Sequence, residues 1–125
     1  MEFKFISRKG AFEIVPIGKL DIEQSESFEK NLNDKVKETE EKALGINLQK
    51  IEYIDSSGLG TLIKVLNNAK NSGKTLYLYG ATPKIQNIFQ IARLEKFFTF
   101  ITQAEFKSKF PSAEDQEGSG LTESE

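Results

Sequence analysis

Two residue types are missing from this chain, and each absence removes a class of function. Its 125 residues include no cysteine and no histidine. Without cysteine the chain can form no disulfide, no thiolate nucleophile and no cysteine-based metal site. Without histidine it lacks the commonest general base and metal ligand. We therefore expect a protein that is not an enzyme and that binds no metal and no cofactor.

Long apolar runs are missing as well. No segment of the sequence approaches the ~20 apolar residues that a transmembrane helix needs. The apolar part of residues 1–6, MEFKFI, is too short for a signal peptide and is broken by charge. We therefore expect a cytoplasmic protein without a membrane partner.

Charge is unevenly distributed along the chain. Residues 1–110 hold 17 basic and 14 acidic residues, whereas residues 111–125 hold five acidic residues and no basic one. The lysines are scattered and do not alternate with aromatic residues in runs, so nothing indicates a nucleic-acid partner. From Pro111 onward Ser, Gly and Glu dominate. We predict one domain, residues 1–110, followed by a disordered acidic tail, residues 111–125.

The most informative segment that is present is residues 55–60, Asp-Ser-Ser-Gly-Leu-Gly. β-Forming residues precede it, and apolar residues follow it at the i, i+3, i+4, i+7 spacing of an amphipathic helix. Asp55, Ser56 and Ser57 are therefore candidate caps for that helix. Two serines are one more than capping requires, so one hydroxyl is free to carry a phosphate at the helix N-terminus.

Each residue of this segment also has a plain structural interpretation. Ser56 is a cap or turn residue on that view, and Asp55 is either a cap or a group that orients the Ser56 hydroxyl. We predict that Ser57 is the structural cap. Gly58 and Gly60 allow either a partner backbone or the sheet to come close. The segment fits neither a phosphate-binding loop nor the nucleophile elbow of a serine hydrolase.

The remaining pattern predicts an α/β fold. Residues 3–7 and 12–17 predict a β-hairpin, and Pro16 predicts a bulge or an edge position in its second strand. A charged helix follows Asp21, with a narrow apolar stripe of Ile22, Phe28, Leu32 and Val36. Further strands are predicted at 43–48, 51–54, 75–79 and 99–101, and further helices from Ser57 to about Asn71, from Pro83 and from Thr102.

Strands separated by helices pair in parallel through right-handed crossovers. The hairpin at the start is antiparallel, so the sheet is predicted to be mixed. The predicted product is an α/β sandwich in which the helices lie mainly on one side of the sheet.

Three segments resemble one known family, STAS, whose name covers sulfate transporters and anti-sigma factor antagonists. The first is residues 55–60 between an apolar strand end and a Leu/Ile-rich helix. The second is residues 18–21, which read Gly-Lys-Leu-Asp, and the third is Gly73-Lys74 followed by the strand at 75–79. The resemblance covers roughly residues 3–110 and implies a STAS-like mixed β-sheet.

The resemblance also implies a function. Small free-standing members of the family are antagonists of anti-sigma factors. The serine after the aspartate, here Ser56, is implied to be phosphorylated by the anti-sigma factor, which is itself a serine kinase. Unphosphorylated antagonist binds that kinase and frees the sigma factor, and a PP2C-type phosphatase resets the cycle. The implied partner-binding surface comprises Asp21, Asp55, Ser56, Ser57, Gly58, Leu59 and Gly60.

Other functions stay open at the level of the sequence. The same surface would serve a STAS adaptor in a non-sigma partner-switching circuit or in a larger signalling assembly. An enzyme or a nucleotide-binding module is disfavoured because histidine, cysteine and a clustered carboxylate pair are absent. The regulatory domain of a transporter is disfavoured because no membrane-spanning segment accompanies it.

Overall fold

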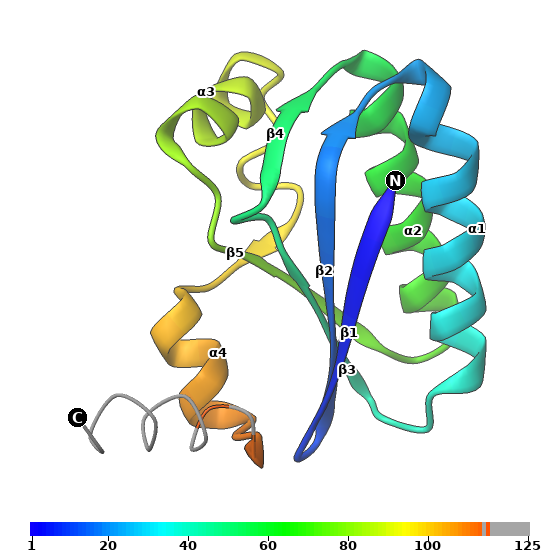
Figure 1. The fold of residues 1–125 in the computed structure, drawn as a ribbon, viewed down its shortest axis with the longest axis vertical. Coiled ribbons are helices and arrows are strands. Elements are labelled where there is room, and N and C mark those ends of the chain that lie inside the picture. The colour runs from blue at the N-terminus through cyan, green and yellow to red at the C-terminus, as the bar shows by residue number, and fades with distance from the viewer. Residues whose placement is uncertain (114, 116–125) are drawn as a thin grey trace.

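The computed structural model describes residues 1–113 and 115 and has the α/β architecture that the sequence predicts (Figure 1). Strands and helices alternate after an initial hairpin. In chain order the elements are β1 (Glu2–Arg8), β2 (Ala11–Leu20), α1 (Ile22–Glu38), β3 (Ala43–Asn47), β4 (Ile51–Ile54), α2 (Ser56–Asn71), β5 (Thr75–Tyr79), α3 (Pro83–Ile91), β6 (Thr99–Phe100) and α4 (Gln103–Lys109).

The sheet is mixed, as predicted. Its strands follow the order β1-β2-β3-β5-β6, and β4 pairs separately with β2. Only the β1–β2 hairpin is antiparallel among these pairs. The carboxyl ends of the parallel strands therefore share one edge of the sheet, where the loops into the helices begin.

Strand β2 changes its partner along its length. Residues Ala11–Ile14 pair with β3, whereas Gly18–Leu20 pair with β4, and the register shifts between Gly18 and Lys19. Pro16 falls between these two ladders, where neither β3 nor β4 pairs with it. Its missing N–H therefore costs no bond to these strands, which explains how a proline sits in a central strand. The irregularity that Pro16 predicts in this strand is present as the register shift two residues further on, after Gly18.

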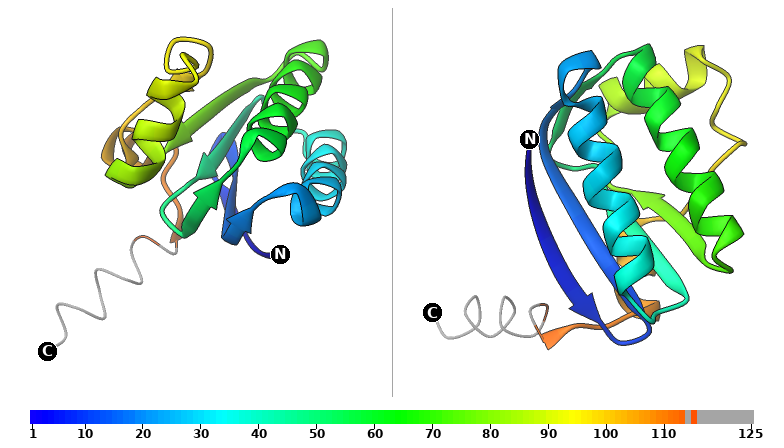
Figure 2. Two further views of the ribbon diagram at one scale, coloured as in Figure 1. Left: turned by 90° about the horizontal axis from the view of Figure 1, so that it is seen from above. Right: turned by 90° about the vertical axis from the view of Figure 1, so that its right-hand side faces the viewer.

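One face of the sheet packs against helices α1 and α2, which lie side by side (Figure 2). The main core lies between these layers. It includes the predicted stripe residues Phe28, Leu32 and Val36 of α1, and Ile85 and Phe89 of α3 join it. Helices α1, α2 and α3 thus cover the same face, and the predicted fold class is confirmed.

Within residues 1–113 and 115, the helix on the opposite face of the sheet is α4. Phe106 of α4 is fully buried against Ala11, Ala43 and Tyr79. Its ring stacks on that of Tyr79 with the centroids 4.3 Å apart. Gly45 makes this possible, because a Cβ there would lie 2.4 Å from the Phe106 ring. The small residue under α4 therefore allows the helix to sit close to the strand.

The predicted acidic tail, residues 111–125, lies mostly outside the described residues. Its first residues do contact the domain. The Lys9 N–H donates to the Pro111 carbonyl at 2.9 Å, and Asp115 forms an ion pair with Arg8 at 2.8 Å. Contacts with the β1–β2 hairpin therefore continue beyond residue 110, where the composition predicts the domain to end.

Candidate functional site

The site begins at the N-terminus of α2, where β4 ends. Asp55 is the N-cap of this helix, and its Oδ1 accepts a hydrogen bond from the Gly58 N–H at 2.9 Å. The backbone of Asp55 is extended, as an N-cap requires, and helical geometry starts at Ser56. One of the orphan N–H groups of the first turn is thereby satisfied.

Asp55 also joins α2 to the neighbouring helix. Its second carboxylate oxygen accepts a hydrogen bond from the Ile22 N–H, the first residue of α1, at 3.1 Å. Asp21 caps α1 in the same way and accepts from the Glu23 and Gln24 N–H groups at 3.1 Å each. The N-termini of α1 and α2 therefore meet, and Figure 1 shows both at the upper end of the molecule. Two carboxylates and two positive helix ends lie together there.

Ser56 is the first helical residue of α2 and is exposed to solvent. Among the residues that the structure describes, its hydroxyl has no hydrogen-bond partner. The prediction that Ser57 is the structural cap is wrong, because Asp55 holds that position. Ser57 is the second helical residue, and its carbonyl, not its hydroxyl, is engaged, accepting from the Thr61 hydroxyl at 3.0 Å.

The two glycines of the segment have different surroundings. A Cβ on Gly58 would lie 2.3 Å from the Leu20 carbonyl oxygen, so this glycine permits the helix start to pack on the sheet. Gly60 has no atom within 4 Å of the position of a Cβ. Of the two glycines, Gly58 therefore allows the helix to approach the sheet closely, and Gly60 faces open space. Leu59 points into the main core and is 9% exposed.

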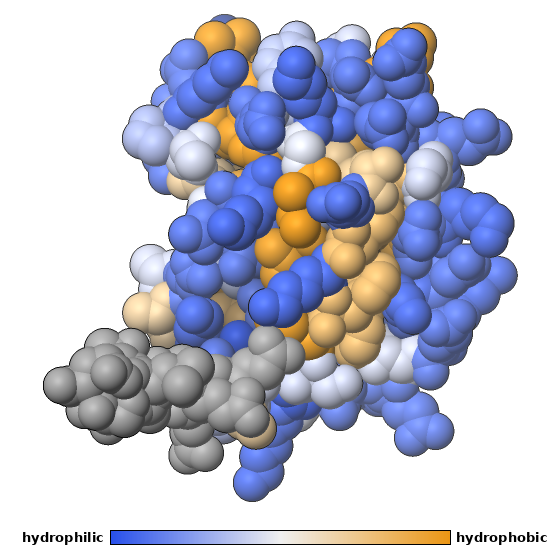
Figure 3. All heavy atoms as spheres, in the orientation of Figure 1, coloured by the Kyte–Doolittle hydropathy of each residue, from blue (hydrophilic) through white to orange (hydrophobic). Residues whose placement is uncertain are grey.

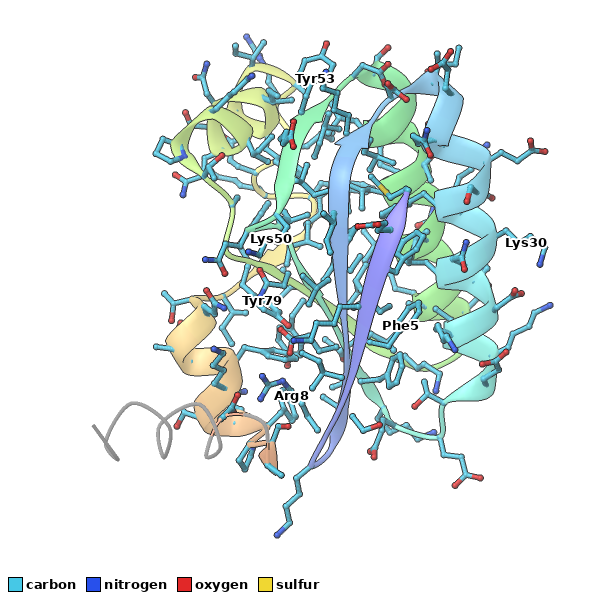
Figure 4. The ribbon with its side chains drawn as sticks, viewed as in Figure 1. Phe5, Arg8, Lys30, Lys50, Tyr53 and Tyr79 are labelled. Atoms are coloured by element: carbon cyan, nitrogen blue, oxygen red, sulfur yellow. The ribbon has the colours of Figure 1, made fainter. Side chains whose placement is uncertain are left out.

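Two apolar side chains are exposed at this end of the molecule. Ile22 is 72% exposed and Tyr53 is 40% exposed. The prediction that Ile22 belongs to the packed stripe of α1 is wrong, because the first turn of α1 extends past the core. Tyr53 lies at the upper end of β4 (Figure 4), with the Lys84 ammonium 5.7 Å from its ring centroid. The sequence pattern does not predict that these two residues are exposed, because isoleucine in an amphipathic helix and tyrosine in a strand are usually buried.

A second polar cluster lies at the other end of the sheet, on the face that carries α4. The Arg8 guanidinium donates to Glu13 at 2.7 Å, and the Tyr79 hydroxyl donates to the same carboxylate at 2.7 Å. Figure 4 shows Arg8 and Tyr79 close together in the lower half of the molecule. Arg8 and Glu13 are 5% and 1% exposed, so this is a buried ion pair.

The electrostatics of this cluster follow from burial and pairing. Burial alone lowers the pKa of Arg8, but its hydrogen bonds and charge contacts with Asp115 and Glu13 raise it overall. Burial raises the pKa of Tyr79, and the negative charge of Glu13 raises it further. Arg8 is thus held charged and Tyr79 neutral, which suits a structural network. The one feature of the sequence that could have indicated this cluster is Glu13, an acidic residue within the apolar run of β2.

Other kinds of site do not emerge from the residues described. Over residues 1–113 and 115, no group of three or more acidic side chains is placed to hold a metal ion. No helix in that part of the chain has the length and apolar character needed to cross a bilayer. The junction of α1 and α2 at Asp55 therefore remains the candidate site.

Comparison with known proteins leads to one family. The STAS domain profile matches residues 4–109. The anti-sigma-B factor antagonist of Staphylococcus aureus (strain NCTC 8325 / PS 47) is 27% identical over 84 residues, which are 67% of this chain and 77% of that protein.

Solved structures share the fold. A crystal structure of a candidate anti-sigma factor antagonist from Thermotoga maritima matches with a TM-score of 0.76 at 21% identity, covering 86% of this chain and 92% of that one. The Bacillus cell fate determinant SpoIIAA in its phosphorylated form matches with a TM-score of 0.63 at 17% identity, covering 86% and 98%. The profile spans most of the chain, so this protein belongs to the STAS domain family.

Proposed function

We propose that this protein is an anti-sigma factor antagonist that works by partner switching. In this proposal it binds an anti-sigma factor serine kinase when unphosphorylated, and a phosphate on Ser56 releases it. A PP2C-type phosphatase removes the phosphate. The observation that carries the proposal is the Ser56 hydroxyl, which is exposed and unbonded within the described residues at the start of α2.

Two features of the site favour Ser56 as the phosphate acceptor. Its hydroxyl does not cap α2, because the Asp55 carboxylate caps this helix. A kinase can therefore phosphorylate this hydroxyl without breaking a hydrogen bond of the fold. Ser57 is less exposed and lies one residue further into the helix. SpoIIAA, whose structure is known with and without phosphate, shares the fold.

The effect of the phosphate follows from its charge. A phosphoserine carries about −1.5 to −2 charges near neutral pH. In the free protein, the N-termini of α2 and α1 stabilise that charge. In a complex, the interface formed around a neutral hydroxyl must instead desolvate the dianion beside Asp55 and Asp21. The fold should therefore survive phosphorylation while the affinity for the kinase falls.

The surface around Ser56 fits a protein partner. Ile22 and Tyr53 are exposed apolar groups close in sequence to Asp21 and Asp55, and Gly60 leaves open space beside the helix. A partner that buried these groups would gain apolar contact area at the point where the phosphate is added. We therefore propose a partner-binding surface of Asp21, Ile22, Tyr53, Asp55, Ser56, Ser57 and Gly60. Gly58 and Leu59, which the sequence places on this surface, are buried within the fold and support it from below.

Phosphate mapping tests the assignment of the acceptor. Wild type, Ser56→Ala and Ser57→Ala are incubated with ATP and the cognate kinase, and phosphopeptides are mapped by mass spectrometry. We expect full incorporation in Ser57→Ala and none in Ser56→Ala. Incorporation that persists in Ser56→Ala and disappears in Ser57→Ala would reverse the assignment.

A further inference from the structure

A hollow of about 560 Å³ lies apart from Ser56, at the carboxyl ends of β5 and β6. Its floor is formed where β5 passes into the loop Tyr79–Ala81 and where β6 ends at Phe100. One wall comes from the last two turns of α3, and the other from the segment that leads into α4. Figure 3 shows the outline indented on the left, at the level that lies between α3 and α4 in Figure 1, which is drawn in the same orientation. We name it the α3–α4 crevice.

The topology explains why a crevice forms at this place. β5 is followed by α3, whose Phe89 packs in the main core on the α1/α2 side of the sheet. β6 is followed by α4, whose Phe106 packs on the opposite face. Two neighbouring parallel strands thus send their chains to opposite faces. In open α/β sheets, ligands bind in the crevice that such a divergence leaves at the carboxyl ends of the strands.

The lining of the α3–α4 crevice combines an apolar surface with polar groups. Phe89, Phe100 and Ile101 provide the apolar part, and the Phe89 and Phe100 rings meet edge to face with centroids 5.2 Å apart. Gln86 and Gln90 of α3 provide carboxamides, and the first donates to the Ala81 carbonyl at 2.9 Å. A mainly apolar pocket with a few directed polar groups is the usual form of a small-molecule site.

The charge of the lining has one sign. Glu95 and Glu105 line the crevice, and no lysine or arginine does. Hydrogen bonds from Thr102 lower the pKa of the Glu105 carboxyl, so it stays ionised near neutral pH. Glu95 makes no ion pair within the described part of the chain. The C-terminal end of α3, with its partial negative charge, lies at the same wall.

We propose that the α3–α4 crevice binds a small organic cation, a ligand with an apolar or aromatic body and a protonated amine. The body lies on Phe100 and Ile101, because Phe89 is buried in the main core, and the ammonium faces Glu95 and Glu105. Aromatic faces and carboxylates both attract a cation and repel phosphate or carboxylate ligands. The proposal does not depend on Ser56 or on partner switching.

Three probes of similar size but different charge test the proposal on the full chain. Phenethylamine, phenethyl alcohol and phenylacetate are titrated separately and followed by backbone amide NMR at neutral pH. We expect phenethylamine to shift the amides of Gly80, Gln90 and Thr102. Its affinity should exceed that of the alcohol no more than about five-fold, because the two carboxylates that attract it are exposed to solvent. Phenylacetate should leave the crevice amides unchanged.

Matched variants isolate the carboxylates. Glu95→Gln combined with Glu105→Gln should bring the affinities of amine and alcohol together, while glutamine at position 105 keeps an acceptor for the cap of α4. Glu40→Gln removes an exposed carboxylate near the amino end of β3, at the opposite edge of the sheet, and should preserve the preference for the amine. Equal binding of the three probes to the wild type, or an absence of crevice shifts with the amine, would overturn the proposal.

Discussion

At the scale of single residues, Asp55 is the key to the site, because one carboxylate serves two helices. It caps α2 through Gly58 and holds the first N–H of α1 through Ile22. Sequence reasoning recognises the capping segment but assigns the cap to Ser57. Three consecutive residues, Asp55, Ser56 and Ser57, can each cap a helix. The contact with Ile22, which is 33 residues away, helps to select Asp55, and no local pattern reveals it.

Replacing Asp55 should therefore destabilise the fold more than replacing either serine. We expect Asp55→Ala to lower the free energy of unfolding by about 1–2 kcal/mol, as for other lost N-caps. Asp55→Asn should lose less, because its remaining oxygen can still accept from Gly58. Urea denaturation followed by circular dichroism measures both. Ser57→Ala is the control and should stay within about 0.5 kcal/mol of the wild type; a loss as large as that of Asp55→Ala would return the cap to Ser57.

At the scale of elements, the start of α2 is positioned by its contact with the end of β2. The apolar spacing predicts the helix, and its C-terminal boundary is confirmed by Gly73, which has a φ of +74°. The distance between helix and strand is set by Gly58, whose contact with Leu20 joins segments far apart in the sequence. The sequence does not predict which face of the sheet α4 covers. The apolar spacing of α4 shows that Phe106 is buried, but Phe106 could pack against either face.

The two glycines of α2 should respond in opposite ways to alanine. Gly58→Ala places a methyl group against the Leu20 carbonyl oxygen and should cost about 1–3 kcal/mol, as overpacking does. Gly60→Ala enters open space and improves helix propensity, so it should stabilise by up to about 1 kcal/mol. Thermal unfolding of the two variants compares them directly. If Gly58→Ala melts at or above the temperature of Gly60→Ala, the helix start does not pack as described.

At the scale of the whole molecule, the buried Arg8–Glu13 pair connects the hairpin to the C-terminal segment. Arg8 donates to the Phe110 carbonyl at 2.9 Å and to both oxygens of Asp115 at 2.8 and 3.0 Å. Composition favours an unattached tail from residue 111, since charge and small residues dominate there. Specific pairing with a buried cation over more than 100 residues is not visible in composition.

The stability that Asp115 contributes should depend on pH. The hydrogen bond from Arg8 lowers the pKa of this carboxyl below its ordinary 3.8. Because the folded pKa is the lower one, the contribution is complete above the unfolded pKa and is lost as the pH falls through the folded one. Asp115 is partly exposed, so Asp115→Asn should cost under ~1 kcal/mol at pH 7.

Denaturation at a series of pH values tests this sign. The difference between wild type and Asp115→Asn should be constant near neutral pH and should shrink below about pH 4. Asp34→Asn, which removes an exposed carboxylate paired with Lys30 along α1, is the control and should have a smaller effect. A difference that grows on acidification would mean that Asp115 does not act through its charge on Arg8.

Calorimetric titration tests most directly whether a phosphate on Ser56 changes binding and leaves the fold intact. The cognate anti-sigma factor kinase is titrated with the unphosphorylated protein and with protein fully phosphorylated at Ser56, and the thermal midpoint of each form is measured alongside. We predict an affinity at least tenfold lower for the phosphorylated form, about 1.4 kcal/mol, with the midpoints within a few degrees. Equal affinities of the two forms, or a loss of affinity that accompanies unfolding, would contradict this prediction.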